Sequence, residues 1–178
     1  GVYERSGVDR MYGAKFASGD FSSLGKQGSL WDDVVIDVSG VTLAASETSG
    51  MDAVFMRNDN SVLHVRYDSS ASAETFGNTG FVYSPRNKRQ STICPALTWH
   101  DGILYMAVQE PEGIYLFTLD PSNSVATPYG NGKNFIANAS MPVLVSDLFL
   151  YIAYNEGGKT WIEALPIGVM EPVELISP

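Results

Sequence analysis

Short apolar segments separated by turn residues recur along the whole chain. The clearest series runs from Ile93 to Leu97, passes a His-Asp-Gly turn at residues 100–102, continues from Ile103 to Val108, and resumes after a Pro-Glu-Gly break as Ile114 to Leu119. Short segments rich in Ile, Val, Tyr and Phe, punctuated in this way, predict consecutive antiparallel strands. They are too short and too often interrupted for helices. The pattern therefore predicts an all-β protein.

The same series of strand signals returns at a spacing of about 46 to 52 residues. Four aromatic residues, Tyr3, Phe55, Tyr105 and Tyr151, mark comparable places in the successive copies. A period of this length, with three or four strand signals in each copy, predicts a β-propeller with one antiparallel sheet, or blade, per repeat. We place the repeats of this single domain, residues 1–178, at approximately 1–38, 39–89, 90–138 and 139–178.

The predicted fold is thus a small β-propeller of about four antiparallel blades. A chain of 178 residues lies at the small end for a closed ring of that kind. Two alternatives stay open: a β-sandwich in which the repeat is a coincidence, and an open array of blades completed by oligomerisation. We expect the last apolar segment, Val173 to Ile176, to pair into the sheet of the first repeat and close the ring.

Composition and charge limit the classes of partner. The chain is 44% apolar and 17% charged, as in a packed globular domain. Its net charge of −9 argues against nucleic acid, which needs a clustered basic face. No apolar run approaches the roughly 20 residues that span a bilayer, which predicts a soluble protein without a membrane span. The single cysteine, Cys94, excludes an internal disulfide. The compartment stays open, with a secreted or extracellular location favoured.

The residues that could carry catalysis form no recognisable constellation. The chain has two histidines, His64 and His100, which excludes a zinc site built from several histidines. It lacks a P-loop, and the spacing of its 20 carboxylates selects no glycosidase pair. We therefore expect a non-enzymatic protein with no catalytic residue, cofactor or metal. A glycosidase- or sialidase-like propeller fragment is the alternative that retains an activity.

A carbohydrate site makes lighter demands on the sequence. An aromatic ring covers the apolar face of a sugar, and charged or amide groups bind its hydroxyls. The candidate ligand-binding residues are an aromatic or basic side chain with polar neighbours, namely Trp99 with His100 and Asp101, Trp161 with Glu163, Trp31 with Asp32 and Asp33, and Arg57 with Asn58 and Asp59. For each tryptophan the alternative is a ring packed in the core, and for Arg57 it is a solvated turn.

The stretch from Met51 to Asp68 resembles the blades of fungal and bacterial β-propeller lectins, in particular the fucose-specific kind. Val2-Tyr3 with Asp9 to Tyr12 is a second such stretch, and Trp99 stands where these blades often carry a tryptophan. The resemblance implies a propeller that binds sugar between blades, through an Arg on the second strand, a Glu on the third and a stacking aromatic ring.

The chain departs from this pattern at the sugar-binding positions. The second-strand position carries Asp52, Leu104 and Leu150 in the successive repeats, and the third-strand position of the closest blade carries His64. Fucose specificity is therefore not implied.

The segment from Tyr154 to Trp161 resembles the Asp box of sialidase-type propellers, with Glu156 in place of the aspartate. In that family the box is a structural turn at the rim of a blade, so the likeness favours a propeller and not an enzyme.

Together these observations predict a carbohydrate-binding, lectin-like module whose partners are glycans or glycoproteins. Repetition of the blades would make it multivalent. A homo-oligomer is among the expected states. The main alternative is a propeller that binds another protein through a flat face.

Overall fold

The computed structural model describes residues 2–4, 11–17, 20–29, 38–45, 51–57, 61–67, 77–83, 93–130 and 134–166. Every regular element in these residues is a β-strand, which confirms the all-β prediction. This part of the chain contains no helix long and apolar enough to cross a membrane.

The strands form four antiparallel sheets, each made from one continuous stretch of the chain. Sheet 1 contains β1 (Val2–Glu4), β2 (Met11–Ala17) and β3 (Asp20–Ser29). Sheet 2 contains β4 (Val38–Ala45), β5 (Met51–Arg57), β6 (Val62–Tyr67) and β7 (Gly77–Tyr83). Sheet 3 contains β8 (Ala96–His100), β9 (Ile103–Glu110), β10 (Gly113–Asp120), β11 (Val125–Pro128) and β12 (Phe135–Ala137). Sheet 4 contains β13 (Ala139–Ser146), β14 (Leu150–Glu156) and β15 (Lys159–Leu165).

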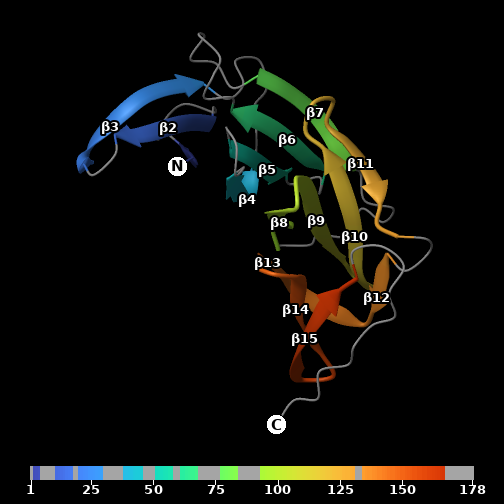
Figure 1. Ribbon diagram of the computed structural model, residues 1–178. Coiled ribbons are helices and arrows are strands. Elements are labelled where there is room, and N and C mark those ends of the chain that lie inside the picture. Colours follow the sequence, from blue (N-terminus) through green and yellow to red (C-terminus); the bar gives the residue numbers. More distant parts are fainter. Residues whose placement is uncertain are drawn as a thin grey trace.

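The sheets follow one another in chain order along an arc (Figure 1), with sheet 1 at the blue end and sheet 4 at the red end. Within each sheet, neighbouring strands are mostly joined by hairpins. Sheet 3 lies between two others, because β8 contacts β4 of sheet 2 on one side and β13 of sheet 4 on the other. Sheets 2, 3 and 4 therefore stack face to face, and the residues between them form the core.

The strands of sheet 3 correct one detail of the sequence reading. The first strand runs from Ala96 to His100, so His100 belongs to β8 and not to the turn. Asp101 and Gly102 alone form the hairpin turn, with φ angles of 47° and 75°. Positive φ at both central residues gives the type of two-residue turn that matches the twist of antiparallel strands. The turn therefore lets β9 pair directly with β8 in antiparallel orientation.

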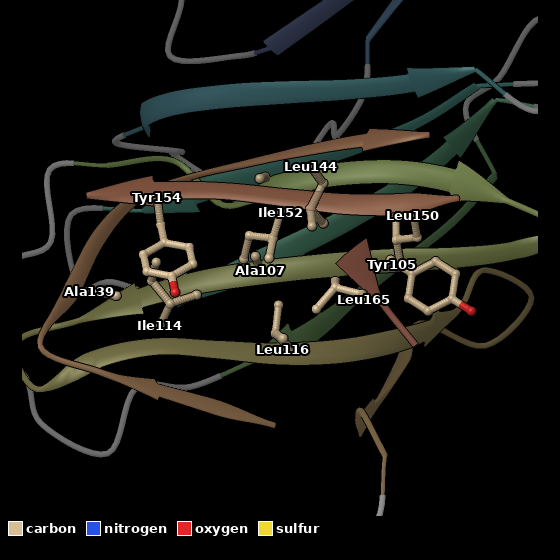
Figure 2. Packing of buried hydrophobic residues seen from close by; sticks show 11 residues of the cluster. Tyr105, Ala107, Ile114, Leu116, Ala139, Leu144, Leu150, Ile152, Tyr154 and Leu165 are labelled. Atoms are coloured by element: carbon tan, nitrogen blue, oxygen red, sulfur yellow. The ribbon is translucent and has the colours of Figure 1, made fainter. Parts of the chain in front are cut away.

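Strand β9 supplies side chains to the core on both of its faces. Leu104, Met106 and Val108 pack toward sheet 2, and Tyr105 and Ala107 pack toward sheet 4. Each large side chain buried in this way contributes about 1.5–3 kcal/mol relative to exposure. Figure 2 shows the layer between sheets 3 and 4, in which Tyr105 and Tyr154 lie toward opposite ends. Its buried members are Ala96, Tyr105, Ala107, Ile114, Leu116, Ala139, Leu144, Leu150, Ile152, Tyr154 and Leu165.

Three of the four aromatic residues that mark the predicted repeat lie on corresponding strands. Phe55, Tyr105 and Tyr151 all lie on the second strand of their sheets. Tyr105 faces the sheet that follows in the chain, but in β5 the residues on that face are Asp52 and Val54. The side chain of Phe55 lies outside the described part of the structure, so its equivalence with Tyr105 stays a prediction.

The predicted closing segment, Val173 to Ile176, lies outside the described residues.

A candidate ligand site between sheets 2 and 3

A cluster of polar side chains lies between sheets 2 and 3. Asp52 on β5 is paired directly with Arg66 on β6, and Val54 with His64. Directly paired residues of antiparallel strands project to the same face of the sheet. Because Asp52 and Val54 face sheet 3, so do His64 and Arg66. Trp99 on β8 joins them from the opposite side.

Asp52 is the centre of this cluster and is fully buried. Its Oδ1 accepts a hydrogen bond from His64 Nε2 at 2.8 Å, and its Oδ2 accepts one from Trp99 Nε1 at 3.0 Å. Arg66 approaches Oδ2 at 3.5 Å. A buried carboxylate needs such donors, because an unpaired buried charge is strongly unfavourable. Asp52, on β5, therefore connects side chains of β6 in its own sheet and β8 in the next sheet.

His64 continues the chain of hydrogen bonds to a turn of sheet 3. While Nε2 bonds to Asp52, Nδ1 forms a second hydrogen bond with Ser124 Oγ, 2.9 Å away. Ser124 lies in the turn between β10 and β11 with a φ of 58°. The imidazole thus connects sheet 2 to sheet 3 at a second point.

The order carboxylate, imidazole, hydroxyl is also that of a catalytic triad. Acyl transfer, however, requires a hydroxyl that a substrate can reach. Ser124 is only 6% exposed, and His64 and Asp52 are fully buried. The arrangement therefore fits a buried network that joins the sheets and not a nucleophilic site.

Arg66 and Trp99 form the part of the cluster that solvent reaches. The Arg66 guanidinium lies over the Trp99 ring, 5.7 Å from its centroid. The Arg66 side chain is 24% exposed, and Trp99 is half-buried. A cation over an indole ring is favourable by about 0.5–2 kcal/mol, depending on how far it is desolvated. These two side chains give the cluster a planar aromatic surface beside a fork of hydrogen-bond donors.

His100 and Asp101, the sequence neighbours of Trp99, do not belong to this cluster. His100 is buried and its Nδ1 forms a 2.8 Å hydrogen bond with Ser146 Oγ at the end of β13. Its Nε2 lies 3.7 Å from Asp101 Oδ2, beyond hydrogen-bonding distance. Asp101 itself is 77% exposed. His100 therefore joins sheet 3 to sheet 4, on the side away from Arg66.

Trp161 and Glu163 lie on β15 and face the core between sheets 3 and 4. Trp161 is half-buried against that core, and Glu163 accepts a hydrogen bond from the Tyr154 hydroxyl. Burial of its ring, followed by the bond to Glu163, raises the pKa of Tyr154. The two tryptophans thus occupy different inter-sheet layers and do not share a site.

The remaining predicted residues fall at or beyond the limits of the described structure. Arg57 is the last residue of β5, and its side chain lies outside the described part. Trp31 lies outside the described residues, as do Asn58 and Asp59.

Sequence reasoning missed the side chains that accompany Trp99. It treated Asp52 and His64 only as departures from the lectin pattern, and it left Arg66 out. A signal was present, because polar residues occur at alternate positions inside otherwise apolar strands, His64 and Arg66 on β6. Buried polar groups of this kind require partners.

The described residues contain no group of His, Cys, Asp and Glu that could hold a metal ion. No protein-family model, curated protein or solved structure matches this chain.

Proposed function

We propose that this protein is a non-enzymatic, carbohydrate-binding module of the β-propeller type, with a sugar site at Arg66 and Trp99 between sheets 2 and 3. One observation carries the proposal. A guanidinium and an indole ring, both partly exposed, meet above a buried carboxylate between two neighbouring sheets.

The chemistry of these groups suits a sugar. An indole ring covers the apolar face of a pyranose, and the guanidinium fork donates hydrogen bonds to its hydroxyls. The buried Asp52 carboxylate holds the indole and the guanidinium in place, because Trp99 donates a hydrogen bond to it and Arg66 lies beside it. The cost of ordering the two contact residues is therefore met before the ligand arrives.

The site has the residue types of the lectin-like blades with their places exchanged. In those blades the Arg lies on the second strand and the acid on the third. Here Asp52 is on the second strand, β5, and Arg66 is on the third, β6. The exchange supports sugar binding as a class and argues for a specificity other than fucose.

The stack of sheets supports the finer architectural proposal, a small propeller of about four blades. Each sheet consists of antiparallel strands from one stretch of chain, and the leading strands β4, β8 and β13 adjoin one another, as the inner strands of blades would. Pairing of Val173 to Ile176 into sheet 1 would close such a ring. Truncation after Pro166 should then unfold the protein or make it oligomeric, and a soluble, equally stable monomer would contradict closure.

Sugar binding is tested with a glycan array and with retention on sugar resins, followed by elution with free monosaccharide. Arg66→Met keeps the aliphatic stem of the side chain but removes every donor, so we expect it to lower affinity for a bound glycan about tenfold or more. Trp99→Leu should act similarly. Trp161→Phe is the matched control, because this tryptophan packs in the other layer.

Three outcomes would overturn the proposal. The first is an array and resins that stay blank for the wild-type protein. The second is binding that Arg66→Met and Trp161→Phe weaken equally, which would indicate loss of fold. The third is turnover of a chromogenic glycoside, which would make the protein an enzyme.

A further inference from the structure

Asp52 and Arg66 carry opposite charges but meet solvent unequally. The Asp52 side chain is 0% exposed, whereas the Arg66 side chain is 24% exposed. A ligand that approaches from solvent therefore reaches the cation of this pair and not the anion. The net charge of −9 opposes an anionic ligand at long range, but exposed charges farther away than about 8 Å are largely screened at physiological ionic strength. The charge that a bound group meets is thus set mainly by its close neighbours.

The Arg66 guanidinium is only loosely engaged by Asp52. Two nearer groups satisfy the carboxylate, because His64 Nε2 lies 2.8 Å from Oδ1 and Trp99 Nε1 lies 3.0 Å from Oδ2. Arg66 Nη1 lies 3.5 Å from Oδ2, at the limit for a hydrogen bond. This is the one polar contact of the guanidinium within the part of the chain that the structure describes. An arginine has five N–H donors, so most of them remain for a ligand.

Trp99 places this cation beside a surface that suits a sugar ring. The indole packs against the apolar core between sheets 2 and 3, and the guanidinium carbon lies over it, 5.7 Å from the ring centroid. A pyranose on the exposed part of the indole therefore has the guanidinium at its edge. In a uronic acid the carboxylate is a substituent at the edge of the ring. Such a sugar can cover the indole and pair with Arg66 at the same time.

We propose that the ligand of this site is an acidic sugar, whose carboxylate forms a bidentate ion pair with Arg66. The inference rests on the proposed function, because it takes the Arg66 and Trp99 site as a sugar site and names the class of sugar. A neutral sugar offers the guanidinium only single hydroxyl oxygens. A carboxylate offers a full negative charge and two oxygens at the spacing of the guanidinium fork. The carboxylate therefore gives this site its selectivity.

The test is a glycan array in which each acidic glycan is present both as the free acid and as its methyl ester. The probes are glucuronosides, galacturonosides and sialosides, beside neutral glucosides and galactosides. The ester keeps the shape of the sugar but removes its charge. We expect the strongest signal from a free acid, and an affinity for its ester that is about tenfold lower when both are measured by titration calorimetry. This ratio should shrink as salt is added.

Two variants of Arg66 separate its charge from its shape. Arg66→Lys keeps the positive charge but lacks the planar fork, so the preference for the free acid should fall several-fold without being lost. Arg66→Met removes the charge and every donor, so the free acid and the ester should bind equally. Trp161→Phe changes a ring in the layer between sheets 3 and 4 and should keep the full preference. Circular dichroism checks the fold of each variant, and the comparison of acid with ester in the wild type needs no variant.

The outcomes distinguish this inference from the proposed function. Equal binding of free acids and esters by the wild type would overturn the acidic sugar and leave sugar binding intact. A preference for the free acid that persists in Arg66→Met would also overturn it, because the carboxylate would then bind elsewhere. Displacement of the bound glycan by an equal concentration of acetate would mean that any carboxylate suffices, against the proposal. If no glycan binds, acidic or neutral, the proposed function fails and this inference fails with it.

Discussion

Sheets 3 and 4 are built from similar strands but differ in how they are buried. The central strand of sheet 3, β9, is covered by sheet 2 on one face and by sheet 4 on the other. The central strand of sheet 4, β14, is covered on one face only within the described structure. The difference arises from position in the stack and not from strand composition. It indicates that a residue's contribution to stability in this protein depends on which sheets adjoin its face.

The largest effect is expected inside sheet 3. Leu104 is buried on β9 against sheet 2, while its neighbour Ile103 is 42% exposed. Leu104→Ala should lower the free energy of unfolding by about 2–5 kcal/mol, because it removes apolar contacts and leaves a cavity. Ile103→Ala should change it by less than about 1 kcal/mol. Urea unfolding followed by circular dichroism measures both, and equal losses would break the comparison of covered and open positions.

The next largest effect concerns the polar junction of sheets 2 and 3. Asp52→Ala leaves His64 and Trp99 without their acceptor, so it should cost about 1–3 kcal/mol of unfolding free energy. Asp147→Ala, at an exposed position of the β13–β14 turn, is the control and should stay within about 0.5 kcal/mol of the wild type. A stability unchanged by Asp52→Ala would mean that the network does not join the sheets.

A pH-dependent effect is expected at the junction of sheets 3 and 4. Burial and the bond to Glu163 raise the pKa of Tyr154 above that of an unfolded tyrosine, which is about 10. The contribution of this group to stability is therefore complete below pH 10 and is lost as the pH rises further, when the unfolded chain releases its proton. Tyr154→Phe should cost about 1 kcal/mol at neutral pH.

The diagnostic part of that experiment is the slope above pH 10. The variant should lose stability less steeply with pH than the wild type, although Tyr105 and Tyr129, whose pKa values burial also raises, keep some slope in both. Thermal unfolding between neutral pH and pH 11 measures the slope. Identical slopes would contradict the role given to Tyr154.

The smallest effect is expected on the open face of sheet 4. Val143→Thr replaces an exposed methyl group by a hydroxyl, so at high dilution the free energy of unfolding should change by less than about 0.5 kcal/mol. The free energy of unfolding of Val143→Thr and of the wild type should also be measured at high protein concentration. A loss that grows with concentration would indicate that another molecule covers this face, and a large loss at high dilution would mean that the chain itself covers it.

The sequence by itself determined that the chain is all-β and where several strands lie. The segments Ile103 to Val108 and Ile114 to Leu119 predicted β9 and β10, because alternating short apolar runs and turn residues are local signals. The turn at Asp101 and Gly102 was likewise local. Strands and tight turns depend on the backbone preferences of a few consecutive residues, so they can be predicted from the sequence alone.

Only the tertiary structure decided which side chains meet. Asp52, Arg66 and Trp99 come together because β5, β6 and β8 present one face each to the same inter-sheet layer, and a shift of one residue would reverse all three. The same one-residue alternation separated Trp99 from His100, and Asp101 lies in the exposed turn, although the sequence had grouped all three. Adjacent residues of a strand face opposite layers, so closeness along the chain does not produce a site, whereas register and stacking do.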